Sequence, residues 1–354
     1  MEFCENWEDI QKRFLQFWAR ENHDLPLMHI TAPRDHAEPA PVSGHATLRD
    51  RWMDTEYQIK KANWWFQNNL YLGEAVPTFN PDLGPDFFST AFGTQIIFAE
   101  HTSWSEHFLT EDMIEEYTGL NIDMANEYYR KMDELTSAGV EDGKDRYLVG
   151  ITDLHPGADG LMSLRGSQPL CYDTLEYQDF IRRVVMDMNP VFNEIYEHLY
   201  KLTTKYQKGS TCWMPLWHPE RWYVPSCDFS IMISDDMYKD LFLDEIREEI
   251  SFLDGSVYHL DGPGALRHLD TLLQIPNLDG IQWVYGAGQP TASHWLEVVR
   301  KIQAAGKCCQ IDVVPSELET MLQELSPEGL HYTIRCKNEE EARDMLKLAE
   351  KYKR

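Results

Sequence analysis

The sequence contains no apolar run long enough to cross a membrane, and its start lacks the basic and apolar segments of a secretory signal. Its cysteines are odd in number and scattered, at positions 4, 171, 212, 227, 308, 309 and 336 of 354 residues. Such a set argues against a disulfide framework and favours reduced thiols. We therefore expect a soluble protein of the cytoplasm.

Basic residues are also scarce. The chain has 32 Lys and Arg against 59 Asp and Glu, which gives a formal net charge of -27. A surplus of this size repels phosphate backbones and anionic membrane surfaces, and it can also serve solubility alone. We expect neither nucleic acid nor a membrane as a partner.

Several enzyme signatures are missing. The sequence has no G-x-S-x-G, no H-E-x-x-H and no C-x-x-C, which removes three common enzyme classes. The glycine-rich turns at 261 to 265 and 285 to 290 follow neither G-x-G-x-x-G nor the phosphate-binding loop pattern. No nucleotide is expected.

Alternating strand and helix patterns dominate what is present, after a first amphipathic helix at 5 to 20. Strands are predicted near 25, 147, 211, 228, 256, 279, 309 and 330, each followed by a segment that can cross over to the next strand. Eight such units predict an α/β fold of the (β/α)8 TIM barrel type with extended N-terminal loops and helices. We expect one domain over 1–354, with the N-terminal helices, first strand and specificity loops in 1–140 and the remaining barrel in 141–354. The aromatic segment 73–104 is expected to set specificity.

The ends of the late strands carry candidate metal ligands. In His259-Leu260-Asp261 the alternation of a strand puts the first and third side chains on one face. Cys336 follows the last predicted strand at the matching end, so closure of a barrel would bring imidazole, carboxylate and thiolate together. These three residues suit Zn²⁺ with a fourth position open. The alternative is a histidine bonded to a neighbouring carboxylate and a buried thiol that packs as a small apolar group.

Other polar and aromatic side chains follow predicted strands. Asp228 and His155 are predicted as catalytic residues that orient the substrate or move a proton. His155 can equally be a cap at the start of a helix. The residues predicted to line a substrate pocket are Tyr172, Trp213, Gln282 and Trp283.

The C-terminal half resembles the uroporphyrinogen decarboxylase-like superfamily. The resemblance is carried by SCDFSIMISDDMYKDLFLDEI (226–246), VYHLDGPGALRHLDTLLQIPNLDGIQWVYGAG (257–288) and GLHYTIRCKNEEEARDMLKLAEKY (329–352). It covers roughly the last 200 residues well and the first 140 only in general layout. The resemblance implies a (β/α)8 barrel that is either a cofactor-free tetrapyrrole decarboxylase or a zinc-dependent methyltransferase that takes methyl groups from a corrinoid protein.

Departures from the two branches separate them. The decarboxylase branch has an arginine-rich R-Q-A-G-R after the first strand, whereas the corresponding LPLMHITAPRDHA offers only Arg34. The methyltransferase branch binds zinc through H-x-C and a distant cysteine, which this sequence matches at His259 and Cys336, with Asp261 in the middle place. A D-x-H-x-x-G corrinoid element is incomplete at 153–158 because Ala158 stands where glycine is required.

The sequence therefore predicts a zinc-dependent methyltransferase-like enzyme. It would move a methyl group from a corrinoid protein, which must be a separate chain, or from a methylated small molecule to a nucleophilic acceptor. One alternative is a metal-free decarboxylase of a small or tetrapyrrole acid, in which Asp228 stabilises developing positive charge. Another is a barrel that binds a corrinoid or tetrapyrrole without catalysis.

Overall fold

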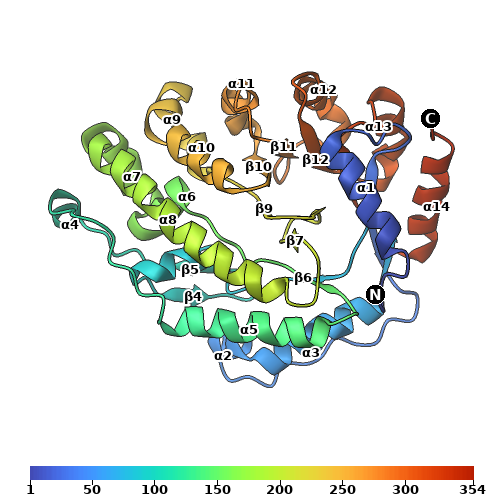
Figure 1. The fold of residues 1–354 in the computed structure, drawn as a ribbon, viewed down its shortest axis with the longest axis horizontal. Coiled ribbons are helices and arrows are strands. Elements are labelled where there is room, and N and C mark those ends of the chain that lie inside the picture. Colours follow the sequence, from blue (N-terminus) through green and yellow to red (C-terminus); the bar gives the residue numbers. More distant parts are fainter.

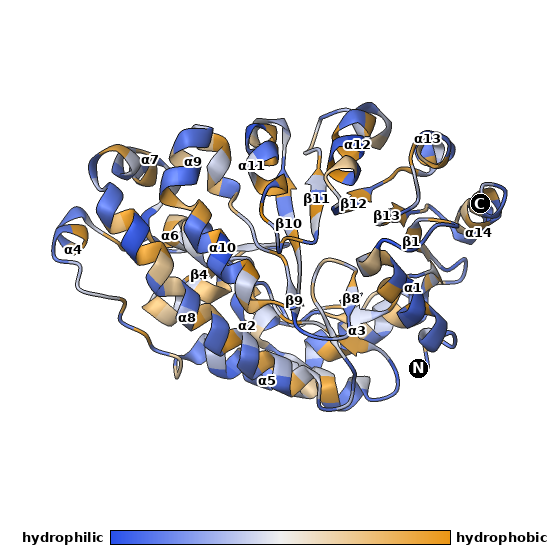
Figure 2. Ribbon diagram, turned by 45° about the horizontal axis from the view of Figure 1, so that its top comes forward, coloured by the Kyte–Doolittle hydropathy of each residue, from blue (hydrophilic) through white to orange (hydrophobic).

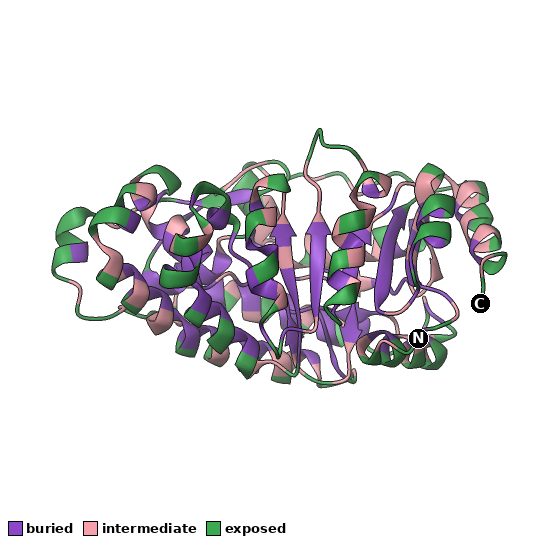
Figure 3. Cartoon of the chain, turned by 90° about the horizontal axis from the view of Figure 1, so that it is seen from above, coloured by how far each residue is buried: buried purple, intermediate pink, exposed green.

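A mostly parallel sheet forms the centre of the protein, which we describe from a computed structural model of residues 1–354. Its seven strands lie in the order β2-β1-β13-β12-β11-β10-β9, and every neighbouring pair except β1 and β2 is parallel. The strands are β1 (Leu27–Pro33), β2 (Asn69–Gly73), β9 (Trp222–Tyr223), β10 (Gly255–Asp261), β11 (Gly280–Val284), β12 (Cys308–Asp312) and β13 (Leu330–Arg335). The sheet is buried on both faces, as apolar parallel strands require (Figure 3).

Six shorter strands form three separate pairs. β3 (Thr78–Phe79) is parallel to β6 (Leu148–Val149), while β4 (Ile96–Phe98) with β5 (Ser103–Ser105) and β7 (Ser210–Thr211) with β8 (Trp217–His218) are antiparallel. Hydrogen bonds continue from β6 to β7 and from β7 to β9. The Ile151 N–H donates to the Thr211 carbonyl at 2.8 Å, and the Trp222 indole donates to the Ser210 carbonyl at 2.9 Å.

The predicted mixed α/β architecture is confirmed, but the strands do not close into one continuous sheet. The antiparallel strand β2 occupies the free edge of β1, so β3 forms no ladder with β1. The chain between β2 and β3 is tied to β1 more locally, since the Glu74 N–H donates to the Met28 carbonyl at 2.9 Å.

Helices cover the outer face of the strands and follow the chain around them (Figure 1). Their apolar sides face inward and their charged sides face solvent (Figure 2). The α-helices are α1 (Trp7–Ala19), α2 (Leu48–Met53), α3 (Thr55–Asn68), α4 (Glu111–Glu115), α5 (Glu127–Gly143), α6 (Gly157–Arg165), α7 (Ser167–Glu176), α8 (Gln178–Thr203), α9 (Asp235–Leu241), α10 (Leu243–Phe252), α11 (Leu269–Leu273), α12 (Leu296–Ala304), α13 (Leu318–Glu324) and α14 (Glu339–Glu350). The 3₁₀ helices are η1 (Phe87–Phe92), η2 (Asp228–Met232), η3 (Pro263–His268), η4 (Ala292–Trp295) and η5 (Pro315–Glu317). None of the helices is long and apolar enough to span a lipid bilayer.

The first helix closes the end of the sheet at which the parallel strands begin. Ile10, Phe14 and Phe17 recur at helical spacing and are buried. The ring of Phe14 stacks on His331 of β13, and the Trp18 indole donates to the Trp217 carbonyl at 2.8 Å. This packing confirms the amphipathic helix predicted at 5 to 20.

The strand predicted near 228 is wrong. That segment is the 3₁₀ helix η2, and the neighbour of β10 is β9, six residues earlier, extended by a parallel bridge between Ser226 and His259. The Asp159 carboxylate accepts the backbone N–H groups of Asp228 and Phe229, at 3.0 and 3.1 Å. These two N–H groups are thus held by a side chain, and the backbone turns at this point.

Candidate metal centre

Three side chains that can bind a metal meet beside the C-terminal end of β10, and we call them the metal-binding group. Asp228, His259 and Asp261 each offer a ligand atom, and these atoms lie within 4.8 Å of one another. His259 and Asp261 project from the same face of β10, as the sequence predicts. The His259 Nε2 and Asp228 Oδ1 atoms are 3.8 Å apart. Two carboxylates and one imidazole form a donor set that suits zinc and harder divalent ions.

The orientation of the His259 ring is fixed by its neighbours. Its Nδ1 bonds to the Oε1 atom of Gln282, the residue beside it on β11, at 2.5 Å. Trp213 packs edge-on against the same ring, with ring centroids 5.6 Å apart. With Nδ1 as the donor to Gln282, the lone pair of Nε2 faces Asp228, which is the arrangement of metal-binding histidines.

A buried carboxylate on α6 positions Asp228. Besides the two backbone N–H groups at the start of η2, the Asp159 side chain accepts the hydroxyl of Ser226 at 2.7 Å. These bonds hold the loop between β9 and η2, so the Asp228 side chain stands opposite His259 while remaining 51% exposed. Partial loss of solvent around its carboxylate, followed by the charge of Asp159, raises the pKa of Asp228 to about 6.

His155 lies behind this group as a cation with a polar partner at each ring nitrogen. Its Nε2 pairs with Asp153 at 2.7 Å and its Nδ1 bonds to the Ser226 hydroxyl at 3.0 Å. Burial alone would lower the pKa of His155, but the surrounding carboxylates, led by Asp153, outweigh it and raise the pKa to about 10. Since both ring nitrogens are used, His155 supplies positive charge beside the centre and holds the Ser226 loop.

Cys336 is not brought into the metal-binding group. Thr333 and Arg335 of β13 line a cavity on the inner face of the sheet. Because side chains alternate along the strand, Cys336 lies on the opposite face, where it packs in the apolar core. Burial and the nearby Glu341 of α14 raise the pKa of its thiol to about 11. β13 is also separated from β10 by β11 and β12. Asp228, predicted as a catalytic residue, takes the third place in the group.

The predicted substrate-binding residues divide between a cavity and the surface. Three of them, Trp213, Gln282 and Trp283, line a cavity of about 340 Å³ beside the metal-binding group. The Trp283 ring, however, is buried and packs edge-on against Trp295 at 5.2 Å. Tyr172 lies 61% exposed on α7 and lines none of the larger cavities, so its predicted role in substrate binding finds no support.

Sequence reasoning missed two groups at this end of the sheet. Asp159 was not identified because a carboxylate in the first turn of a helix has the ordinary role of stabilising the helix terminus. Asp312 and Arg335 form an ion pair at 2.9 Å, and both line the cavity beside the metal-binding group. Alternation along β12 and β13 turns both side chains toward that cavity. Strand alternation was the signal that could have identified this pair.

Comparisons with known proteins bear on the fold. Neither the models of known protein families nor the curated proteins give a match to the sequence. Among solved structures, a methyltransferase from Methanosarcina mazei is similar over 97% of this chain and 98% of its own, with a TM-score of 0.64 and 10% sequence identity. The two proteins therefore share a fold along their whole length.

Proposed function

We propose that this protein is a metal-dependent methyltransferase-like enzyme of the uroporphyrinogen decarboxylase-like superfamily, with zinc held by Asp228, His259 and Asp261. The observation that carries the proposal is the convergence of these three ligand atoms within 4.8 Å. The resemblance of residues 226–352 to that superfamily supports it, as does the fold shared with a methyltransferase. We regard the ring of strands as an irregular form of the (β/α)8 barrel.

The donor set fits a catalytic metal. Three protein ligands leave a further position for a substrate group, as in catalytic zinc sites. Bound zinc would lower the pKa of a nucleophile so that it can accept a methyl group at neutral pH. Gln282 would hold the His259 ring, and the positive charge of His155 would keep Asp228 ionised beside it.

The methyl donor is proposed to be a separate corrinoid protein or a methylated small molecule. Trp213 and Gln282 reach both the His259 ring and the adjacent cavity, so a small substrate there would lie next to the metal.

All seven cysteines are unpaired, which supports a reducing, cytoplasmic setting.

The decarboxylase alternative is less well supported by the site. A carboxylate substrate in the cavity beside His259 would require a free cationic group there. Arg335, the cation in the cavity wall, is already paired with Asp312. His155 is likewise paired with Asp153.

Metal analysis and a methyl-transfer assay test the proposal together. Purified protein dialysed against zinc is expected to retain one zinc per chain, and His259→Ala is expected to retain none. His23→Ala, which changes an exposed histidine remote in sequence, is the control and is expected to retain the zinc. Zinc-loaded protein is expected to demethylate methylcobalamin in the presence of a thiol, followed by the cobalamin absorbance. Wild-type protein that folds normally but holds no zinc would overturn the proposal.

A further inference from the structure

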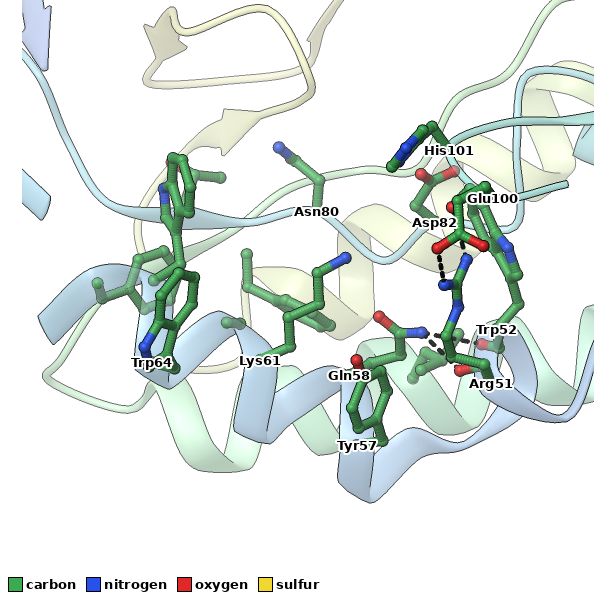
Figure 4. A pocket seen from close by; sticks show the side chains of 16 residues that line it. Arg51, Trp52, Tyr57, Gln58, Lys61, Trp64, Asn80, Asp82, Glu100 and His101 are labelled. Atoms are coloured by element: carbon green, nitrogen blue, oxygen red, sulfur yellow. Dashed lines mark hydrogen bonds and ion pairs between the residues drawn. The ribbon is translucent and has the colours of Figure 1, made fainter. Parts of the chain in front are cut away.

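A second cavity lies away from the metal-binding group and shares no lining residue with it. It has a volume of about 590 Å³ and is enclosed by α2 and α3 on one side and by the chain after β3 on the other (Figure 4). Glu100 and His101, from the turn between β4 and β5, complete its wall. The volume falls within the range of small-molecule sites.

Aromatic side chains form much of this wall and are held in place. The Trp52 indole donates to the Ala99 carbonyl at 2.9 Å, and the Trp64 indole donates to the Glu38 carbonyl at 2.7 Å. Trp65 and Phe79 also line the cavity. Because the indole N–H groups of Trp52 and Trp64 are already bonded, these two rings can offer apolar faces to a flat ligand without reorganising.

One cation in the wall has no partner. Arg51 is paired with Glu100, whereas Lys61 of α3 forms no ion pair or hydrogen bond, and its side chain extends between α3 and Asn80 (Figure 4). The Asn80 side chain makes no hydrogen bond within the chain either, and its Oδ1 atom is buried. The nearby Asp82 carboxylate accepts the Gly84 N–H at 2.6 Å. Lys61 and the Asn80 amide thus remain available as donors to an anionic group.

The inner wall of the cavity adjoins the strand that leads to His155. β3, which leads to Asn80 and Asp82, pairs with β6, which leads to Asp153 and His155. Burial raises the pKa of Asp82, and the charge of Asp153 adds to that shift.

We propose that this cavity binds a flat aromatic ligand that carries one anionic group, with the ring against the tryptophan side chains of the wall and the anion on Lys61. The proposal goes beyond methyl transfer and does not rest on it, because binding needs neither metal nor turnover.

Isothermal titration calorimetry with two probes that share the same ring system and carry opposite charges tests the proposal. We expect 2-naphthoate to bind wild-type protein and 2-naphthylmethylammonium to bind at least about tenfold more weakly. Lys61→Met is expected to weaken naphthoate binding by roughly tenfold, as loss of a charged hydrogen bond does. Lys60→Met, which removes an exposed neighbouring cation outside the cavity, is the matched control and is expected to leave binding unchanged.

Trp64→Ala locates the site, since it should weaken both probes without changing the preference for the anion. Thermal unfolding of each variant verifies that the fold is kept. The proposal is overturned if the cationic probe binds as tightly as naphthoate, if Lys61→Met and Lys60→Met behave alike, or if a well-folded Trp64→Ala binds both probes like wild type.

Discussion

Replacing Gln282 with leucine isolates the hydrogen bond that orients the His259 ring. Gln282 is buried, with 7% exposure, and its Oε1 atom accepts from His259 Nδ1 at 2.5 Å. Removal of such an outer-shell partner lowers metal affinity by roughly 10- to 100-fold, which corresponds to about 1.4 to 2.8 kcal/mol. We therefore expect zinc to bind Gln282→Leu weaker by that factor, as measured by competition with a chromophoric chelator at fixed pH.

Gln310→Leu is the matched control for this change. Gln310 lies beside Gln282 on the next strand and is also buried, but it bonds to Asp312 and Thr333 instead of His259. Its replacement should lower stability without changing zinc affinity by more than about twofold. Equal losses of affinity in the two variants would show that the effect comes from general disturbance of the core, and the reasoning about His259 would fail.

Three further predictions concern groups around the site. Cys336→Ser should leave zinc affinity unchanged in the same competition assay, and a loss of more than about tenfold would restore the thiol as a ligand. Burial raises the pKa of Glu249 from the ordinary value of 4.5 to about 8. The stability that the protonated side chain contributes is therefore fully present below pH 4.5 and is lost as pH rises through 8. In urea unfolding we expect the wild-type protein to lose about 3 kcal/mol of stability between pH 6 and 9 through this group, and Glu249→Gln not to show that loss. Gly157→Ala should lower the free energy of unfolding by about 1 to 3 kcal/mol in the same assay. The backbone of Gly157 has φ +61°, and an added Cβ would lie 2.3 Å from Glu245 Oε2. Unchanged stability would contradict that packing.

The sequence predicted those elements in which side chains recur with the period of a helix or of a strand. The spacing of apolar residues located α1, and alternation placed His259 and Asp261 together on β10. Cys336 was placed with them only because it follows the last strand in a barrel expected to close, whereas in the structure Arg335 is the residue at that end that lines the cavity.

Contacts between distant segments explain what the sequence could not predict. The apolar run after Asp228 resembles a strand, yet the Asp159 carboxylate, 69 residues earlier, binds its backbone and turns it into η2. The same bonds carry Asp228 to His259, so the third member of the group depends on an interaction that no local pattern contains. The antiparallel ladder of β2 on β1 likewise could not be read from composition, and it prevents regular closure of the ring.

X-ray absorption at the zinc edge of the metal-loaded protein measures the ligands of the proposed centre directly. Coordination by Asp228, His259 and Asp261 predicts a first shell of nitrogen and oxygen at about 2.0 to 2.2 Å and no sulfur. A sulfur scatterer near 2.3 Å, or zinc that remains fully hydrated, would contradict the metal centre described for this protein.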